Sequence, residues 1–415
     1  IRLQESYVFG KAGNFEQARE TAIQAMRIFE NALQEKNLSL VVGSHSTGIR
    51  RTLAGDPVDL GRTHLLLGTV EAVEGKTTDA LNYLNAALTI FEQYDRLREI
   101  AMVCGNVGDF YLRKTEYEAA QAMLRRSLNI AERIGDVSVM LVAFGNLGTL
   151  SLRFGDLAGA ELHYRRSLAL AEQVHDPMYM SLLYSYLTTA LLEQGKNDNI
   201  SSYLCQSLVI GRSLHFAPCI GFGLVVLGKL RIAQSQSAIQ SKVSSAQFLL
   251  RASNALNRAL SLEGLEAETR SECILLLAQV AFLRGKNEAA QKQIMQFMGE
   301  VDRKDQIWLL ACAQRLLGSI LAAQNRREKA KTHFVQSLQI LKECGMRLEW
   351  ARTLRDYNET ILRGTHSGND DSERAITHLQ EARQVFQESG AALELELVDR
   401  LLAEYATPIE AGVHK

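Results

Sequence analysis

Several features are scarce in this chain of 415 residues, and each scarcity excludes a class of protein. The six cysteines form no Cys-x-x-Cys pair, which argues against a disulfide or zinc framework. A formal net charge of −1 gives no global attraction to nucleic acid or to an anionic membrane, and leaves room only for a local patch. Neither a signal peptide nor an apolar run of about eighteen residues is evident. We therefore expect a soluble, cytoplasmic protein whose cysteines are buried free thiols in a reducing compartment.

Signatures of catalysis and metal binding are also missing. No G-x-S-x-G element occurs, and none of the nine histidines shows H-E-x-x-H or H-x-E spacing. The stretch GSHSTG, residues 43–48, lacks the Gly-Lys-Ser/Thr ending of a phosphate-binding loop. We expect no enzyme activity, no cofactor and no metal site.

The chain contains a tandem repeat of forty residues. Residues 105–144, GNVGDFYLRKTEYEAAQAMLRRSLNIAERIGDVSVMLVAF, align without a gap to residues 145–184, and 14 of 40 positions are identical. In each copy a glycine (Gly108, Gly148) precedes an alanine (Ala120, Ala160) by twelve residues, with a polar turn between them. This pattern predicts two short helices per repeat, which approach each other closely at the small residues.

The repeat resembles the tetratricopeptide repeat family. The matching positions are Cys104, Val107, Gly108, Tyr111, Ala120, Leu124 and Ser127, then Phe144, Leu147, Gly148, Ala160, Tyr164 and Ser167. The resemblance implies an all-α fold, a right-handed superhelical solenoid of helix-turn-helix repeats. The forty-residue period and the GNLG-type first helices are most similar to the sensor regions of large bacterial transcription regulators of the maltose-activator type.

The second-helix alanine marks about nine repeats along the chain. It recurs at Ala18, Ala80, Ala120, Ala160, Ile200 as a substitute, Ala252, Ala290, Ala330 and Ala375. We predict one solenoid over residues 1–406, closed by a helix over 391–406, and a tail over 407–415. The longer intervals predict irregular insertions at about 37–62, 233–246 and 364–374; the second of these either extends its flanking helices or forms a loop. Because the chain opens without methionine and partway through a helix, we expect a piece of a longer polypeptide.

The resemblance implies a binding groove, because in tetratricopeptide solenoids the first helices line a concave wall that holds peptides or protein segments. Counting from Gly108, we expect this wall to include Gly105, Asn106, Asp109, Arg113, Gly145, Asn146, Thr149, Arg153, Ser185, Thr189, Lys229, Arg315, Arg352 and Arg355. The small residues at 105, 145 and 185 either open space for a ligand or allow close helix packing. Asn106 and Asn146 resemble groove asparagines that hold a peptide backbone, since an amide both donates and accepts hydrogen bonds.

Two functions follow from this pattern. The first is an interaction module that binds a protein or peptide in the groove, as the sensor or scaffold part of a larger bacterial regulatory protein in signal transduction. Lys229, Arg315, Arg352 and Arg355 would make the later part of the groove basic and suited to an acidic segment. The alternative is a response-regulator-binding phosphatase or inhibitor of the helical-repeat type, in which Gln279 or Glu272 would face a phosphoryl group. The sequence leaves the partner and the oligomeric state open, and predicts no direct binding to nucleic acid or membrane.

Overall fold

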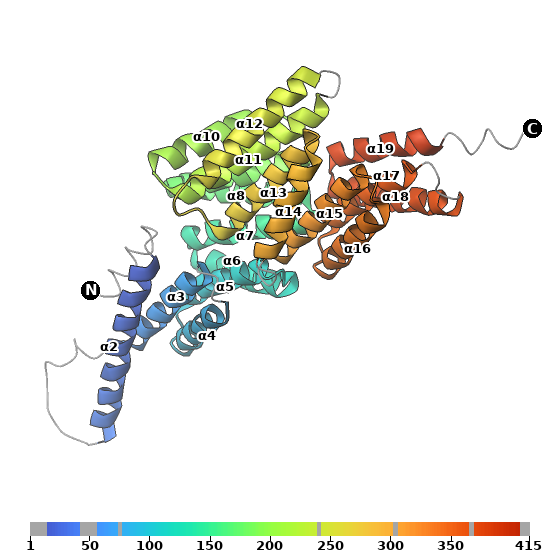
Figure 1. The fold of residues 1–415 in the computed structure, drawn as a ribbon. Coiled ribbons are helices and arrows are strands. Elements are labelled where there is room, and N and C mark those ends of the chain that lie inside the picture. Colours follow the sequence, from blue (N-terminus) through green and yellow to red (C-terminus); the bar gives the residue numbers. More distant parts are fainter. Residues whose placement is uncertain are drawn as a thin grey trace, which may run out of the picture. The chain divides into compact units, whose positions relative to one another are not determined.

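Every element in the described part of the chain is an α-helix, which confirms the all-α fold class (Figure 1). The structure, a computed structural model, describes residues 15–41, 56–73, 77–238, 242–301, 306–364 and 369–406. The helices are α2 (Phe15–Val41), α3 (Pro57–Val73), α4 (Thr77–Gln93), α5 (Leu97–Arg113), α6 (Tyr117–Ile134), α7 (Val137–Phe154), α8 (Leu157–Gln173), α9 (Pro177–Glu193), α10 (Ile200–Ser213), α11 (Ala217–Ser237), α12 (Lys242–Leu260), α13 (Ala267–Leu283), α14 (Asn287–Glu300), α15 (Ile307–Ala323), α16 (Arg327–Glu343), α17 (Arg347–Leu362), α18 (Asn369–Ser389) and α19 (Ala392–Ala406).

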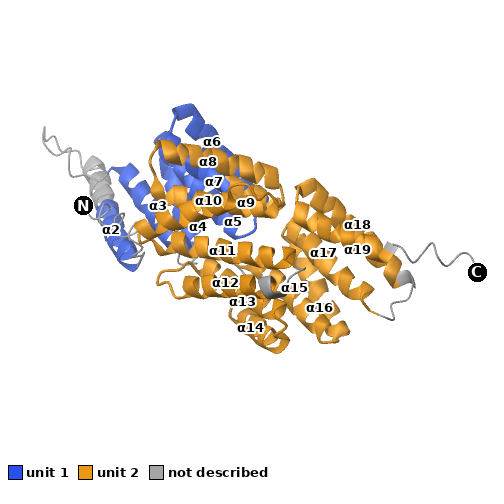
Figure 2. Cartoon of the chain, turned by 90° about the horizontal axis from the view of Figure 1, so that it is seen from above, with its two compact units in different colours: residues 1–146 blue, residues 147–415 orange. Residues whose placement is uncertain are grey.

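The chain divides into two compact units, residues 1–146 and 147–415, with the boundary inside α7 (Figure 2). Within each unit, the helices in extensive contact are neighbours or next neighbours in chain order, such as α5 with α6 and α15 with α17. This order of contacts is typical of a repeat array, in which each hairpin packs on the adjacent one. The prediction of a single solenoid over 1–406 stays a prediction.

Each hairpin is held by a small residue on its first helix and a large one on its second. A Cβ atom added to Gly108 would lie 2.6 Å from the Leu124 side chain, and one added to Gly148 would lie 2.6 Å from the Tyr164 ring. The same contact recurs between Gly318 and the Phe334 ring at 3.0 Å. Distances this short leave no room for a side chain, so glycine sets how closely the two helices approach.

All nine predicted marker residues lie on second helices and are buried. They are Ala18 on α2, Ala80 on α4, Ala120 on α6, Ala160 on α8, Ile200 on α10, Ala252 on α12, Ala290 on α14, Ala330 on α16 and Ala375 on α18. The marker residues therefore identify the second helix of each hairpin correctly.

Helix boundaries between repeats are set by local chemistry at two turns. The Asp176 carboxylate accepts a hydrogen bond from the backbone N–H of Tyr179 at 3.0 Å, and Pro177 begins α9. Gly135, which ends α6, has φ of +69°, and Asp136 then accepts from the N–H of Val139. These are an N-cap carboxylate and a left-handed C-terminal glycine, which satisfy backbone groups that a helix end leaves unpaired.

Each of the three predicted insertions is partly helical. Helix α2 continues to Val41 and α3 begins at Pro57, so the ends of the 37–62 segment are helical, and residues 42–55 lie outside the described part. In the 233–246 segment α11 continues to Ser237 and α12 begins at Lys242, as expected if the flanking helices are extended. In the third, α18 begins at Asn369, inside the predicted 364–374 insertion. The closing helix is confirmed as α19, whereas the tail 407–415 is outside the described residues.

Two described helices, α7 and α11, are long and apolar enough to cross a membrane, with mean hydropathy of 1.4 and 1.3, although the sequence was expected to hold no such run. Both also carry residues of the buried core, among them Leu141 and Leu147 on α7 and Leu224 and Val225 on α11. Length and composition alone do not separate a core helix from a membrane span, and this burial is what a core helix requires.

All six cysteines are free thiols, and five of them are buried. Burial raises the pKa of Cys219 to about 11 and the pKa of Cys273 and Cys312 to about 12. Cys205 on α10 is exposed, which corrects the expectation that all six are internal.

The hairpin contact predicts opposite effects for two Gly→Ala substitutions. Gly148→Ala should lower the free energy of unfolding by about 1–3 kcal/mol, because the new methyl group meets the Tyr164 ring. Gly299→Ala on α14 should raise it by roughly 0.4–1 kcal/mol, because nothing lies within 4 Å of the added atom. Urea unfolding of both variants measures the difference, and equal effects would contradict the proposed role of Gly148.

Candidate functional site

In residues 56–146 the predicted wall residues lie on α5 and the first part of α7. Asn106 and Asn146 occupy equivalent positions, forty residues apart, and both side chains are partly exposed. The Asn106 amide nitrogen donates a hydrogen bond to the Thr69 hydroxyl on α3 at 3.1 Å. This contact ties neighbouring first helices together through groups that can also bind a peptide backbone.

Beside the asparagines lies a solvent-exposed ion pair. The Arg113 guanidinium contacts the Asp109 carboxylate at 3.0 Å, one turn away on α5, and both side chains are about two-fifths exposed, at 42% and 41%. Gly105 has a different role, because an added Cβ would lie 3.4 Å from the hydroxyl of buried Ser127. For Gly105 the structure therefore favours close helix packing over an open ligand space, whereas Gly145 is partly exposed.

In residues 147–415 the predicted polar wall residues take part in helix packing. Ser185 is 0% exposed, and its hydroxyl lies 2.7 Å from the Ser207 hydroxyl on α10. Thr189, 6% exposed, donates to the Ser185 carbonyl oxygen at 3.0 Å. Thr149 accepts a hydrogen bond from the Tyr164 hydroxyl at 3.2 Å. Ser185 and Thr189 therefore present little surface to a ligand.

All five predicted wall cations of this unit are paired with carboxylates. Arg153 contacts Glu268 at 2.9 Å and lies over the Trp308 ring, 3.9 Å from its centroid. Lys229 contacts Glu272 at 2.6 Å. Because Glu272 is held by this ammonium group, it is not the free carboxylate that the phosphatase alternative requires.

The other three cations form a compact charge cluster with four carboxylates. We define the charge cluster as Glu193, Arg315, Glu349, Arg352, Arg355, Asp356 and Glu394.

Arg352 is at the centre of the charge cluster. Its guanidinium contacts Glu349 at 2.5 Å, Glu394 at 2.6 Å and Glu193, while its side chain is only 15% exposed. Arg355 pairs with Glu394 and with Asp356, the latter at 2.7 Å.

Burial and charge act in opposite directions on the acid–base behaviour of the cluster. Burial alone would raise the pKa of the Glu349 carboxyl, but the Arg315 and Arg352 guanidiniums outweigh it and hold that pKa well below its ordinary value. Burial would likewise lower the pKa of Arg352, whereas Glu193 and Glu349 raise it. Glu349 and Arg352 therefore stay ionised at neutral pH.

Because these cations are paired, the prediction that the later part of the groove is basic and suited to an acidic segment is wrong. The five cations face six carboxylates, namely Glu193, Glu268, Glu272, Glu349, Asp356 and Glu394. One of these partners was visible in the sequence, because Glu193 stands forty residues after Arg153 at the same repeat position. The others lie on different helices, and no local pattern links them to the cations.

The two ends of the second unit meet at its hairpin turns. Leu157, at the start of α8, is 0% exposed and belongs to one apolar cluster with Leu348 and Leu354 of α17. A Cβ added to Gly155 would lie 3.4 Å from the Leu348 Cβ, and one added to Gly195 would lie 3.4 Å from the Ala392 Cβ. Residues 147–415 therefore close on themselves, with charged side chains on the inner side.

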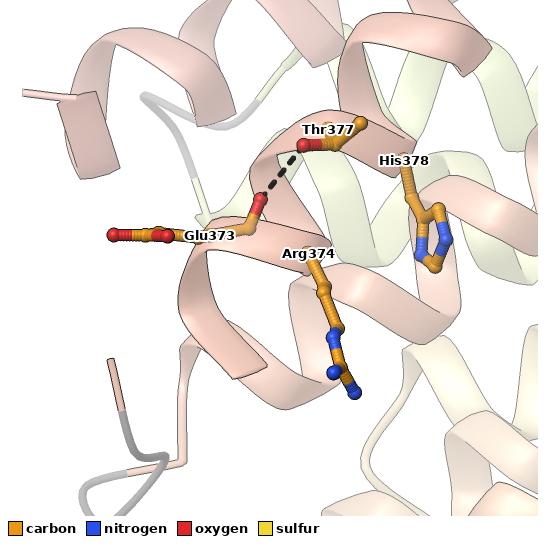
Figure 3. Close-up of a pocket in the computed structure, with 4 residues that line it drawn as sticks. All are labelled: Glu373, Arg374, Thr377 and His378. Carbon is orange, nitrogen blue, oxygen red and sulfur yellow. Dashed lines mark hydrogen bonds between the residues drawn. The ribbon is translucent and has the colours of Figure 1, made fainter. Parts of the chain in front are cut away.

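A shallow hollow of about 300 Å³ lies on the surface of α18 and was not predicted from the sequence. Figure 3 shows its four residues on one helix, with Glu373 directed away from Arg374 and the Thr377 hydroxyl bonded to the Glu373 carbonyl oxygen, 3.0 Å apart. His378 is held by Asn358, with 3.2 Å between Nδ1 and Oδ1. A hollow lined by one helix cannot desolvate a ligand, and the described residues contain no His/Cys/Asp/Glu group able to hold a metal ion.

Removal of one carboxylate tests the electrostatics of the cluster. Glu349→Gln should lower the free energy of unfolding by about 3–5 kcal/mol at neutral pH, because Arg315 loses its carboxylate partner at 2.7 Å and keeps as a counter-charge the Asp356 carboxylate, 3.8 Å away. The Glu349 pKa is depressed in the folded state, so its contribution is present above the unfolded value of about 4.5 and is lost as pH falls through the folded value. Urea unfolding across that acid range should show the variant and the parent converging.

Comparison with known proteins supports the repeat and the fold. The family model described as tetratricopeptide repeat matches residues 59–133 and 97–173. No curated protein matches the chain. Among solved structures, a Rap protein complexed with competence and sporulation factor is similar, with 12% identity, a TM-score of 0.53, and 97% of this chain and 98% of that chain covered.

Two further structures have the same fold. The Rap conjugation gene regulator of plasmid pLS20, in complex with the Phr* peptide, has a TM-score of 0.57 at 14% identity, and 91% of this chain and 97% of that one are covered. NprR in complex with its cognate peptide NprX has a TM-score of 0.50 at 14% identity, covering 81% and 99%. Residues 59–173 therefore match the tetratricopeptide repeat family, and the close packing of Gly108 and Gly148 against large side chains lies within that range.

Proposed function

We propose that this protein is an interaction module that binds an extended peptide, or an extended segment of a partner protein, on the wall formed by α3, α5 and the first part of α7. The observation that carries the proposal is the pair Asn106 and Asn146, partly exposed at equivalent positions of successive first helices. A carboxamide offers one acceptor and one donor group to a peptide backbone, so it grips a chain without demanding a particular side chain.

The spacing of the helices suits an extended chain. Helices α3 and α5 contact each other directly, and packed helices lie roughly 8–10 Å apart. An extended chain rises about 3.3 Å per residue, so successive first helices would meet it about every third residue. Thr69, Asn106 and Asn146 would then contact one face of the bound segment at regular intervals.

The distribution of charge favours this wall, rather than the inner side of residues 147–415, as the peptide-binding surface. The Asp109–Arg113 pair is exposed and can exchange its partners with a ligand at low cost, since exposed ion pairs contribute little. In the second unit, by contrast, each predicted wall cation is held by an acidic partner. A ligand there would have to displace one of these carboxylates.

Similar structures support a peptide as the partner. The Rap regulator of pLS20 and NprR were both solved with a bound peptide, and each has the fold of this chain. We further propose that the chain is the sensor or scaffold part of a larger bacterial regulatory protein in the cytoplasm. Its five buried free thiols are consistent with a reducing compartment.

Substitution of both asparagines tests the proposal. Short peptides selected for binding from a random phage-displayed library serve as the probe, and their affinity is measured by fluorescence anisotropy. Asn106→Ala with Asn146→Ala should weaken binding about tenfold or more, because each lost amide removes hydrogen bonds worth roughly 1 kcal/mol. The thermal unfolding midpoint should change little, since both side chains are partly exposed.

Asn129→Ala with Asn254→Ala is the matched control, because both asparagines are exposed on second helices, α6 and α12. This variant should keep the parent affinity. Peptides that bind the parent and the Asn106/Asn146 variant equally would remove these residues from the site.

A further inference from the structure

Within the charge cluster, Glu193 is the one member that comes from the other end of the second unit. Arg315, Arg352, Arg355 and Glu394 lie on α15, α17 and α19, which are successive first helices. Glu193 ends α9, and its carboxylate reaches Arg352 across 159 residues of sequence. The Glu193–Arg352 pair therefore joins the α9–α10 hairpin to the α17–α18 hairpin.

Besides the apolar contact of Leu157, at the start of α8, with Leu348 and Leu354 of α17, the contacts at this junction are made by turns. The left-handed turn at Gly195 lies against Ala392, and the turn at Gly155 lies against Leu348 and Ser389. Between α8 and α19, the helices in extensive contact are all neighbours or next neighbours in order. No described helix of the first hairpins lies along α17 or α19 over a long stretch, so the junction is small compared with the interfaces between consecutive hairpins.

The ion pairs around Arg352 allow this junction to open and close again. If Glu193 separates from Arg352, the guanidinium keeps Glu349 and Glu394, so no unpaired charge remains buried. Glu193 in turn gains water and stays within the field of Lys229. Breaking a buried ion pair is costly chiefly when one partner is left without a counter-charge, and that condition is absent here.

We propose that the Glu193–Arg352 pair is an electrostatic latch that holds residues 147–415 in a closed turn, and that the turn opens at this point without unfolding. The open state separates the α9–α10 turn from the start of α19. It also gives solvent and ligands access to the charged inner side, which the closed state occupies with its own ion pairs. The latch is independent of the peptide wall proposed for residues 56–146.

An engineered disulfide reports the closed state. A Cβ at position 195 would lie 3.4 Å from the Ala392 Cβ, close to the separation of about 3.8 Å found in disulfides. Gly195→Cys with Ala392→Cys is made in a Cys205→Ser background, because Cys205 is the exposed native thiol. Mild oxidation followed by gel electrophoresis then gives the rate of cross-linking.

Glu193→Gln removes the latch charge while preserving the size of the side chain, and should slow cross-linking about tenfold. Arg347→Met is the matched control, since the Arg347–Glu388 pair is also on α17 but is exposed and joins α17 to the adjacent α18. This control should cross-link at the parent rate. Equal rates for Glu193→Gln and the parent would overturn the proposal.

Small-angle X-ray scattering gives a second measurement that needs no cysteine at the left-handed position 195. Glu193→Gln in the otherwise native chain should increase the radius of gyration while the helical circular dichroism stays unchanged, and Arg347→Met should alter neither. An unchanged radius of gyration, or an increase accompanied by loss of helix, would show that the pair is not a latch.

Discussion

The structure depends on one steric constraint, the contact in several hairpins between a glycine on the first helix and a large side chain on the second. Gly108 with Leu124, Gly148 with Tyr164 and Gly318 with Phe334 repeat this contact along the chain. Because it fixes how closely the two helices approach, it also fixes which face of each first helix remains outside the hairpin. The asparagines of the first unit and the charged residues of the second unit lie on these first helices.

The positions of the repeats could be predicted because they depend on local sequence. All nine marker residues lie on second helices, and the caps at Asp136 and Asp176 are likewise local, since a cap needs only neighbouring residues. The predicted limits of the three insertions were less accurate. Polar stretches such as residues 233–237 have no apolar period, yet they continue a helix whose earlier turns are already packed.

The predicted wall was harder to interpret because its chemistry depends on tertiary pairing. The sequence identified Arg153 and Lys229 as wall cations but could not show their partners, Glu268 and Glu272, which lie on another helix. It also left open whether Ser185 serves a ligand or helix packing. The hydrogen bond to Ser207 decides that question, and it depends on how α9 and α10 pack.

The contrast between the exposed thiol on α10 and the five internal ones has a practical consequence. Only the thiolate reacts with alkylating reagents, and burial suppresses the thiolate of Cys219, Cys273 and Cys312 by raising their pKa values. Maleimide dyes should therefore attach at Cys205, in the helix that follows the Glu193 turn. The native chain thus carries its own attachment point for a fluorophore, through which motion of that hairpin can be followed in single molecules.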